Sequence, residues 1–349
     1  MKELFVSASR SYRVLIGSGL LPRAGELALP VIEGRHALIA AGERVFGLYG
    51  EALSQSLEEA GFSVWNCVYP SGESYKTPET MLLIVKALAE AGFDRGDAVF
   101  ALGGGVTGDM AGLAAALYER GIPCVLLPTT LLAAADASVG GKTAVDLPQG
   151  KNLLGCFAQP RLVLCDTDCF RTLPEEVYAE GWAEIVKCAF LRPSLLPLLE
   201  TPEPAERLEE ILAACVALKS ELVSADEYDL GERRLLNFGH TLGHAIERCS
   251  GWEIPHGQAV ATGMAILTRG CAARGLCPAE TAARLEALLK RFGLPTRCEY
   301  APGELLAAAR ADKKRRGERI TLALPGRDGR PALKDMSYEE FGELIALGL

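Results

Sequence analysis

The sequence lacks the features that mark several classes of protein. It has no run of about 20 apolar residues, the length that a membrane-spanning helix needs. Its first residues, MKELFVSASRSYRV, contain no apolar core of a secretory signal peptide. Basic residues are in the minority, with 36 Lys and Arg against 45 Asp and Glu, whereas nucleic-acid binding depends on clustered cations. We therefore expect a cytoplasmic protein with no membrane or nucleic-acid partner.

The eleven cysteines form no recognisable framework. Their number is odd, they are scattered, and no CxxC pair occurs, so neither a set of disulfides nor a zinc knuckle is predicted. Cys124 and Cys165 lie within apolar runs, where a thiol behaves as a small apolar side chain. The pattern indicates a reducing compartment.

The first half of the chain alternates apolar runs with helical patterns. This alternation predicts a parallel sheet that is covered by helices on both faces. The predicted strands are residues 36–41, 62–69, 97–105, 122–130 and 161–166, and the helical patterns between them include residues 81–92 and 108–121.

After about residue 174 the apolar residues recur with the period of a helix. Only ITLALPGRDGRPAL, near the C-terminus, predicts a small hairpin. We therefore expect a Rossmann-like α/β nucleotide-binding domain over residues 1–174. An all-helical domain, apart from that hairpin, is expected over residues 175–349.

A glycine-rich turn, ALGGGVTGDMAG at residues 101–112, ends a predicted strand and opens a predicted helix. Such a turn lets a ligand approach the backbone, and the helix N-terminus offers free N–H groups to a phosphate. Because the turn departs from GxGxxG, it could equally be an ordinary tight turn. The run PTTLLAAADASVGGKTAVDLPQGKN then adds Lys142 and Lys151, both flanked by glycine, and favours a phosphate-bearing ligand.

Histidine is scarce, yet three of the four histidines lie in LNFGHTLGHAIERCSGWEIPHGQAV. His240 and His244 are four residues apart and share one face of a predicted helix, while His256 opens the next helix. Two histidines and a carboxylate would make a catalytic zinc site. The residues leave the carboxylate open, because EGWAEIVK offers both Glu180 and Glu184.

Seven segments resemble 3-dehydroquinate synthase, a family of the sugar phosphate cyclase superfamily. In order and approximate spacing they are GGGVTGD, PTTLL, DASVGGKTAVD, GKN, AEIVK, LNFGHTLGHAIE and HGQAV, and the resemblance extends from residue 71 to residue 314.

The resemblance implies a lyase of the shikimate pathway of aromatic amino acid biosynthesis. Such an enzyme converts 3-deoxy-arabino-heptulosonate 7-phosphate to 3-dehydroquinate and phosphate, using NAD and a divalent metal, zinc or cobalt. The alcohol is transiently oxidised, phosphate is eliminated, the ketone is reduced again, and an intramolecular aldol reaction closes the ring.

The resemblance also implies roles for individual residues. The metal ligands would be Glu184, His240 and His256, which makes the second domain the metal-binding one. Catalytic roles fall to His244, Asp229, Lys142, Lys187, Arg233 and Asn237. The substrate, a phosphorylated keto-sugar acid, would contact Arg120, Asp136, Lys142, Asn152, Lys187, Lys219, Arg233, Asn237, His244 and one of Lys313 and Lys314. NAD would contact Glu73, Lys76, Gly103, Gly104, Gly105, Val106, Thr107, Gly108, Asp109, Thr129, Thr130, Asp136, Lys142, Lys151, Cys169, Phe170, Arg171 and Thr172.

Arg120 is implied to reach the site of a neighbouring subunit, so a homodimer is expected. Four features depart from the pattern of the family. Residues 40–44, AAGER, lack the Asp or Asn that the family often uses near the adenosine ribose, and Trp182 replaces a smaller apolar residue and is expected only to fill space. Asp229 stands where glutamate is usual, and Gln258 replaces a frequent glutamate beside His256. We expect the change at Gln258 to affect the surroundings of the metal without abolishing metal binding.

Other functions are weaker alternatives. A related cyclase that makes 2-deoxy-scyllo-inosose or 2-epi-5-epi-valiolone would share NAD, metal and glycine turn, but Asn237, His244 and the lysines of DKK favour 3-dehydroquinate synthase. A metal-dependent polyol dehydrogenase would release NADH and would not need so many cations. A nucleotide-binding regulatory module would leave the histidines unexplained.

Overall fold

The computed structural model describes residues 1–312 and 318–349, which form two compact units. Unit 1 comprises Met1–Leu173 and Leu212–Tyr228, and unit 2 comprises Pro174–Ile211 and Asp229–Leu349. Within the residues that the structure describes, no helix combines the length and the apolar character that crossing a membrane requires.

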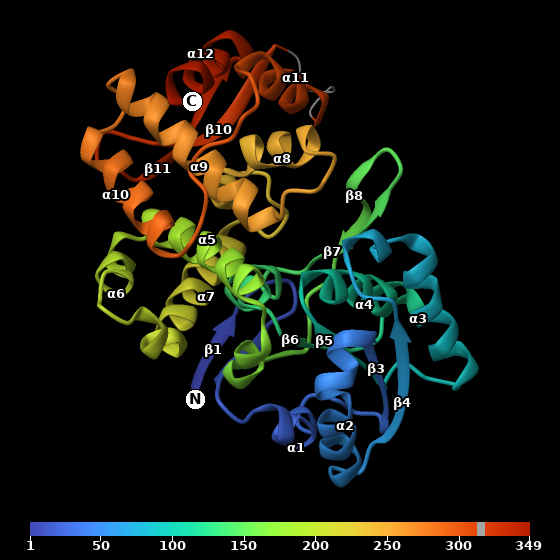
Figure 1. Ribbon diagram of the computed structural model, residues 1–349. Coiled ribbons are helices and arrows are strands. Elements are labelled where there is room, and N and C mark those ends of the chain that lie inside the picture. The colour runs from blue at the N-terminus through green and yellow to red at the C-terminus, as the bar shows by residue number, and fades with distance from the viewer. Residues whose placement is uncertain (313–317) are drawn as a thin grey trace. The chain divides into compact units, whose positions relative to one another are not determined.

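Unit 1 is built on a seven-stranded sheet with the order β1-β2-β9-β6-β5-β3-β4. Figure 1 shows its central strands side by side. All five predicted strands are present, as β3 (His36–Gly42), β4 (Ser63–Tyr69), β5 (Ala98–Gly103), β6 (Cys124–Pro128) and β9 (Leu162–Asp166). Two strands that the sequence analysis did not predict, β1 (Lys2–Val6) and β2 (Tyr12–Gly17), extend the sheet.

The sheet is mixed, which corrects the expectation of a purely parallel one. Strand β2 pairs in parallel with β9, but the edge strand β1 runs antiparallel to β2, with Leu4 opposite Val14. Strand β1 is mostly exposed and reaches β2 through a short connection, and antiparallel neighbours can be joined by such a tight turn.

Helices cover both faces of this sheet, as predicted. Alternate residues of β3 point to opposite faces, so that Ile39 packs in one apolar cluster and Leu38 in another. The first cluster includes residues of α1 (Ala24–Ala28) and α2 (Glu43–Glu59), and the second includes residues of α3 (Pro78–Glu90) and α4 (Gly105–Leu117). The remaining elements of unit 1 are η1 (Leu21–Arg23), η2 (Glu73–Tyr75), η3 (Tyr118–Arg120), η4 (Ala133–Ala137), β7 (Lys142–Leu147), β8 (Gly150–Phe157) and η5 (Thr167–Thr172).

Strands β7 and β8 form an antiparallel hairpin that begins within the run of glycine-flanked lysines, residues 128–152, and continues beyond it. Val145 of β7 is buried against α4, whereas most of β8 is exposed, and the hairpin projects away from the sheet (Figure 1). The hairpin therefore carries Lys151 and Asn152 on its outer strand.

Over the residues that the structure describes, unit 2 is helical apart from the hairpin of β10 (Arg319–Pro325) and β11 (Pro331–Ser337), which confirms the hairpin predicted from the sequence. Its helices are α5 (Glu175–Leu191), η6 (Pro193–Leu195), α6 (Leu196–Leu199), η7 (Pro204–Arg207), η8 (Glu232–Asn237), α8 (His240–Cys249), α9 (His256–Ala273), α10 (Ala279–Arg291), α11 (Pro302–Asp312) and α12 (Tyr338–Gly348). Helix α7 (Leu208–Ala225) begins in unit 2 and ends in unit 1.

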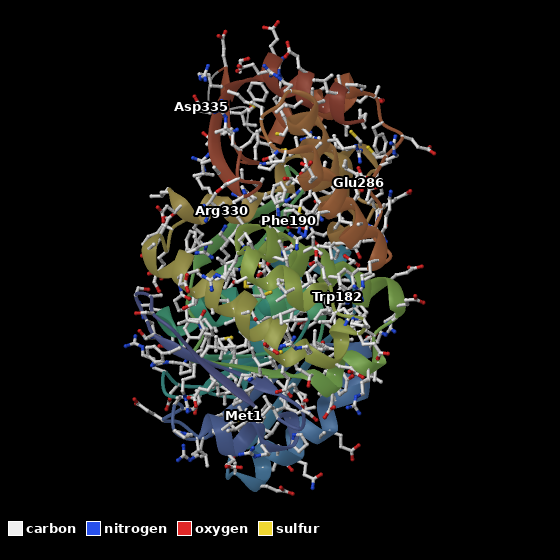
Figure 2. The ribbon with its side chains drawn as sticks, turned by 90° about the vertical axis from the view of Figure 1, so that its left-hand side faces the viewer. Met1, Trp182, Phe190, Glu286, Arg330 and Asp335 are labelled. Atoms are coloured by element: carbon white, nitrogen blue, oxygen red, sulfur yellow. The ribbon has the colours of Figure 1, made fainter. Side chains whose placement is uncertain are left out.

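The core of unit 2 lies between α8, α9, α11, α12 and β10, where Leu242, Ile266 and Phe341 are buried. Trp182 of α5, labelled in Figure 2, stacks on Phe292 at the end of α10 with ring centroids 4.2 Å apart. This contact supports the sequence-based interpretation that Trp182 fills space.

None of the eleven cysteines, which all lie in the described part of the chain, belongs to a disulfide. Burial raises the pKa of Cys67 to about 11 and that of Cys124 to about 12, so these thiols stay protonated at neutral pH. Cys249 and Cys298 are partly buried, and Cys156, on β8, is exposed.

Candidate active site

The histidines of unit 2 are carried by two helices that touch closely. Helix α8 begins at His240, so His240 and His244 lie one turn apart, and α8 packs against α9. A Cβ atom at Gly243 would lie 3.1 Å from Cα of Val260 on α9. Glycine at this position therefore lets the two backbones approach each other.

A tight turn between α8 and α9 returns His256 to the first two histidines. Gly251 and Trp252 both have positive φ, 64° and 70°, and the Trp252 N–H donates to the carbonyl of Glu247 over 2.7 Å. The three rings gather as a result. Their centroids are 5.3 Å apart for His240 and His256, 5.8 Å for His240 and His244, and 5.9 Å for His244 and His256.

A buried carboxylate of α5 faces two of these rings. Oε1 of Glu184 lies 3.5 Å from Nε2 of His240 and 3.7 Å from Nε2 of His256, and the side chain of Glu184 is 1% exposed. Ligand atoms about 2 Å from a tetrahedral zinc ion lie roughly 3.3 Å from each other. The three donor atoms thus have nearly the spacing of ligands around one divalent metal.

Glu180, the other carboxylate that the sequence offered, is engaged elsewhere. It lies one turn before Glu184 on α5, and its carboxylate accepts a hydrogen bond from the backbone N–H of Gly257 over 3.2 Å. This contact fixes the first turn of α9, next to His256, since the N–H groups of that turn have no partner within the helix.

The partners of Glu184 and His240 orient the donor atoms. Nδ1 of His240 lies 3.3 Å from the carbonyl oxygen of Phe238, so a proton on Nδ1 would leave Nε2 free to act as a ligand. Nζ of Lys187 contacts Oε2 of Glu184, which leaves Oε1 facing the histidines. Lys187 is also 1% exposed.

Other predicted residues of unit 2 lie on α5 or in and beside η8. Arg233 is buried in η8, Asn237 ends η8 half-buried, and Asp229 is half-buried just before it. Lys313 and Lys314 lie outside the described residues.

In unit 1 the glycine turn lies at the carboxyl end of β5. The Thr129 N–H donates to the carbonyl of Gly103 over 2.9 Å, which ties the turn to the end of β6, and α4 begins at Gly105. Strand β3 pairs with β4 on one side and with β5 on the other, so the chain crosses from one side of β3 to the other between β4 and β5. The glycine turn therefore flanks the point where the strand order reverses, the usual place for a nucleotide in a doubly wound sheet.

A buried lysine, Lys76, contacts several of the predicted residues of unit 1. Nζ of Lys76 lies 2.6 Å from Oδ2 of Asp109 on α4 and donates to Oδ1 of Asn152 on β8, also over 2.6 Å. Burial would lower the pKa of Lys76, but the carboxylates of Asp109 and Glu73 outweigh burial and raise it. Nζ of Lys151 lies 3.4 Å from Oε1 of Glu73.

A second lysine–aspartate contact involves α7. Nζ of Lys219 contacts the carboxylate of Asp136 and donates to its backbone carbonyl over 2.6 Å, so the predicted substrate residues Asp136 and Lys219 are adjacent. Lys142 is exposed at the start of β7. Thr130 accepts a hydrogen bond from Ala133 at the start of η4.

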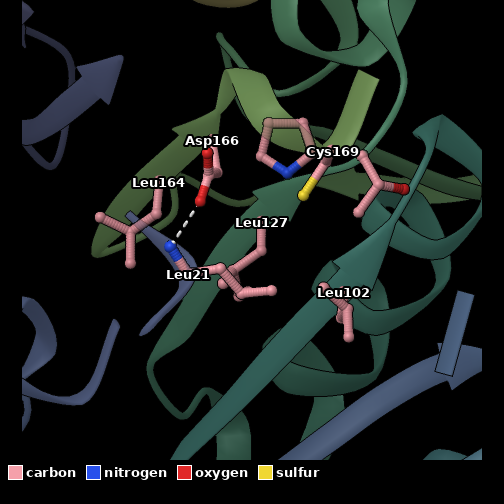
Figure 3. A pocket seen from close by; sticks show the side chains of 8 residues that line it. Leu21, Leu102, Leu127, Leu164, Asp166 and Cys169 are labelled. Carbon is pink, nitrogen blue, oxygen red and sulfur yellow. Dashed lines mark hydrogen bonds between the residues drawn. The ribbon is translucent and has the colours of Figure 1, made fainter. Parts of the chain in front are cut away.

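The predicted nucleotide residues at 169–172 lie in η5. The hydroxyl of Tyr49 donates to the carbonyl of Cys169 over 2.9 Å and also contacts Thr172. Cys169 and Thr129 line a narrow crevice at the carboxyl ends of the strands, shown in Figure 3. At its edge, the carboxylate of Asp166 accepts a hydrogen bond from the Leu21 N–H over 2.7 Å.

Left-handed backbone marks several predicted residues. Arg120 has φ of 66°, Asn152 of 55° and Asp229 of 59°, a region that is uncommon for residues with a Cβ. Arg120 is exposed in η3 and takes no part in the contacts of Lys76 with Asp109 and Asn152. Because strained backbone often occurs at functional positions, these angles support a role for the three residues.

Sequence reasoning missed residues whose importance depends on the fold. Asp146 accepts the backbone N–H of Asn152 over 2.7 Å, and Tyr49 holds η5. Glu247, on α8, lies 3.5 Å from Nδ1 of His256. Only the three-residue spacing of His244 and Glu247, which places both on one side of α8, pointed to Glu247 in the sequence.

Comparison with known proteins finds two matching family descriptions. "3-dehydroquinate synthase N-terminal" matches residues 66–180, and "3-dehydroquinate synthase C-terminal" matches residues 181–315. A 3-dehydroquinate synthase of Dehalococcoides mccartyi is 41% identical over 344 residues, which cover 96% of each chain.

Two solved structures are similar over almost the whole chain. A 2-deoxy-scyllo-inosose synthase complexed with carbaglucose-6-phosphate, NAD⁺ and Co²⁺ has a TM-score of 0.88 at 26% identity, with 100% of both chains covered. A 2-epi-5-epi-valiolone synthase from Streptomyces hygroscopicus with NAD⁺ and Zn²⁺ bound has a TM-score of 0.86 at 31% identity, with 98% of both chains covered.

Proposed function

The chain belongs to the 3-dehydroquinate synthase family, and from this premise we propose the reaction and the roles of its residues. The enzyme converts 3-deoxy-arabino-heptulosonate 7-phosphate to 3-dehydroquinate and phosphate. The observation that carries this proposal is the convergence of Oε1 of Glu184 with Nε2 of His240 and of His256.

The metal-binding residues of the proposal are Glu184, His240 and His256. One carboxylate and two imidazoles suit zinc or cobalt and leave a coordination position for a substrate oxygen. Similar proteins with NAD⁺ and Co²⁺ or Zn²⁺ bound support this choice of cofactors. When bound, the metal would acidify a substrate hydroxyl, and NAD would accept a hydride and later return it.

His244 is proposed to move a proton. Its ring lies 5.8 Å from that of His240 and 5.9 Å from that of His256, between centroids, so it borders the metal ligands without belonging to the Glu184 set. Histidine suits this role because an imidazole can both accept and donate a proton. Asp229 is proposed as a further proton acceptor.

NAD is proposed to bind in unit 1, at the glycine turn. The carboxyl ends of β5 and β6, the first turn of α4 and the buried Lys76 contacts support this assignment. We further propose that residues 1–174 bind the nucleotide and that residues 175–349 hold the metal.

Cations are proposed to bind the two acidic groups of the substrate. A chain with a net charge of −9 repels a polyanion at long range, so binding depends on local cations. Lys187 and Arg233 are each 1% exposed, and such buried cations hold an anion strongly because water screens them little. Lys142, Asn152 and the other implied substrate residues complete the set.

The cytoplasmic location and the homodimer also belong to this proposal. Arg120, exposed with left-handed backbone in η3, is proposed to reach the site of the neighbouring subunit. Mixing an Arg120→Ala variant with a His240→Ala variant tests this. Two inactive homodimers should regain activity on mixing if Arg120 acts across the interface, and no activity should return if it acts within its own subunit.

The reaction itself is tested by incubating the purified protein with the heptulosonate phosphate, metal and a catalytic amount of NAD. We expect phosphate release over many turnovers with no net NADH, because NAD is regenerated within each turnover. Accumulation of NADH would instead identify a dehydrogenase. If no phosphate appears, the sugar phosphates used by the inosose and valiolone synthases are tested in turn, and product identification separates the cyclases.

A further inference from the structure

We propose that Glu247 is a positioning residue that fixes the ring of His256, so that Nε2 of His256 points at the metal. The inference rests on the proposed metal site and adds a residue to it. Glu247 was not among the ligands or catalytic residues predicted from the sequence.

The ring of His256 lies between two carboxylates. Its Nδ1 is 3.5 Å from Oε2 of Glu247, and its Nε2 is 3.7 Å from Oε1 of Glu184. The two nitrogens lie on different edges of the imidazole, so one ring can donate Nδ1–H to Glu247 while Nε2 acts as a ligand on the side of Glu184.

The surroundings of Glu247 support a fixed role. The residue is 1% exposed, and a buried carboxylate is costly unless a partner compensates it. Its backbone carbonyl accepts hydrogen bonds from the Ser250 hydroxyl over 2.8 Å and from the Trp252 N–H over 2.7 Å. These bonds anchor Glu247 to the turn that leads to His256.

The two proposed histidine ligands differ in the group that lies beside Nδ1 of the ring. His240 begins α8 and has the carbonyl of Phe238 beside its Nδ1, whereas His256 has a carboxylate there. A carboxylate is a stronger acceptor than a carbonyl and makes the imidazole a better ligand. Since His256 is 33% exposed, more than the 13% of His240, its ring has more need of such a partner.

Glu247 could instead be a ligand, because His244, Glu247 and His256 form a second group of possible metal donors. Binding two metals through both nitrogens of His256 would require an imidazole that has lost both its protons, which is unusual at neutral pH. One metal at Nε2 requires no such deprotonation. The chemistry of the imidazole therefore argues against a second metal at Glu247 beside the first and favours positioning.

The test compares Glu247→Gln and Glu247→Ala with the control Glu253→Gln. The control removes the same charge from an exposed position of the same turn. Affinity for Zn²⁺ and Co²⁺ is measured by competition with a chelator, the number of bound ions by elemental analysis, and the ligand geometry by the visible spectrum of bound Co²⁺. The thermal midpoint of the metal-free proteins monitors folding.

We expect one ion per chain in the wild type, about 10-fold weaker metal binding in Glu247→Gln and about 100-fold weaker binding in Glu247→Ala. The Co²⁺ spectrum of Glu247→Gln should shift, and Glu253→Gln should match the wild type in every measurement. Should Glu247→Ala fail to fold, Glu247→Gln decides alone, since its amide keeps the size of the side chain.

Unchanged affinity and an unchanged Co²⁺ spectrum in Glu247→Gln would overturn the inference. So would two bound ions in the wild type that fall to one in Glu247→Gln, since Glu247 would then be a ligand. In both cases loss of metal in His240→Ala would leave the proposed function intact. A wild type that binds neither ion would instead overturn the proposed metal site, and the inference with it.

Discussion

In unit 2 the candidate metal ligands project from three helices, whereas in unit 1 the candidate nucleotide and phosphate residues are spread over the glycine turn, α4, η4, η5, α7 and the hairpin β7–β8. The helices are held by apolar packing, with Leu242 and Ile266 in the core of unit 2. The elements of unit 1 are held together partly by the candidate residues themselves, since Lys76 joins Asp109 of α4 to Asn152 of β8. Substitutions at the helical site of unit 2 should therefore affect chemistry more than stability, and substitutions at the candidate residues of unit 1 should affect both.

The largest expected effect is on turnover, at the helical site. His240→Ala should lose metal and lower kcat by at least about 10³-fold, because it removes a ligand of a site with only three. His244→Ala should keep the metal and still lose turnover. Metal content and steady-state kinetics check both, and the ligand assignment fails if both variants retain stoichiometric metal. The thermal midpoint of each metal-free variant should stay close to that of the wild type.

The candidate residues of unit 1 should respond differently. Lys76→Met should lower the free energy of unfolding by about 1–3 kcal/mol, because it leaves the half-buried carboxylate of Asp109 without its lysine. Lys151→Ala, at a partly exposed contact with Glu73, should cost about 1 kcal/mol or less and should weaken NAD or phosphate binding. Urea unfolding and NAD titration separate the two. Equal stability losses, or unchanged binding in Lys151→Ala, would contradict the assigned roles.

A smaller effect on stability is expected where α8 packs closely on α9. Gly243→Ala should cost about 1–3 kcal/mol, since the new Cβ would lie 3.1 Å from Cα of Val260 and push the helices apart. It should also weaken metal binding, because His240 and His256 lie on those two helices.

Gly47→Ala is the matched control in unit 1. The new Cβ would meet no atom within 4 Å, and this change within α2 should raise stability by up to about 1 kcal/mol. Thermal melts of both variants measure the contrast.

The smallest effects concern pH, and they have opposite signs in the two units. In unit 2, Glu286 (labelled in Figure 2) lies 2.9 Å from Nη1 of Arg269. Burial would raise its pKa, but Arg269 and Lys290 outweigh burial and lower it. Its contribution, about 1 kcal/mol or less, is therefore present above pH of about 4.3 and lost as pH falls through the lowered pKa.

The raised pKa of Lys76 works the other way. Its contribution is present below pH of about 10.4, the unfolded value, and is lost as pH rises through the raised folded pKa. Urea unfolding at several pH values should show Glu286→Gln approaching the wild type in acid and Lys76→Met approaching it in alkali. The reverse order would mean that the two contacts do not act as described.

Much of the fold could be predicted because it depends on local patterns. Apolar runs marked β3 and β9, and the helical periodicity that begins after residue 174 marked unit 2 as mostly helical. Strand β1 was missed because its residues are mostly exposed and lack a buried pattern. The hairpin β7–β8 was missed because its glycines and lysines resemble a loop, although Val145 is buried.

The histidines of the candidate site could be predicted from the sequence, but the carboxylates that contact them could not. The scarcity of histidine singled out His240, His244 and His256, but Glu180 and Glu184 are one turn apart on α5 and equally plausible from residue type. The fold decides between them, because Glu180 accepts a hydrogen bond from the backbone of Gly257, whereas Glu184 faces the rings of His240 and His256. Glu247 is a single helical glutamate in the sequence, and only the turn at Trp252 brings His256 to it.

The exposed thiol of Cys156 gives the hairpin β7–β8 a position where a fluorophore can be attached. Thiolates are the species that react with maleimides, and burial raises the pKa of Cys67, Cys124 and Cys169 to about 11 or 12. A fluorophore added in substoichiometric amount at neutral pH should therefore attach mainly at Cys156. It would sit on the same strand as Lys151 and Asn152, so the unaltered chain could report the arrival of a ligand at this strand by a change in emission.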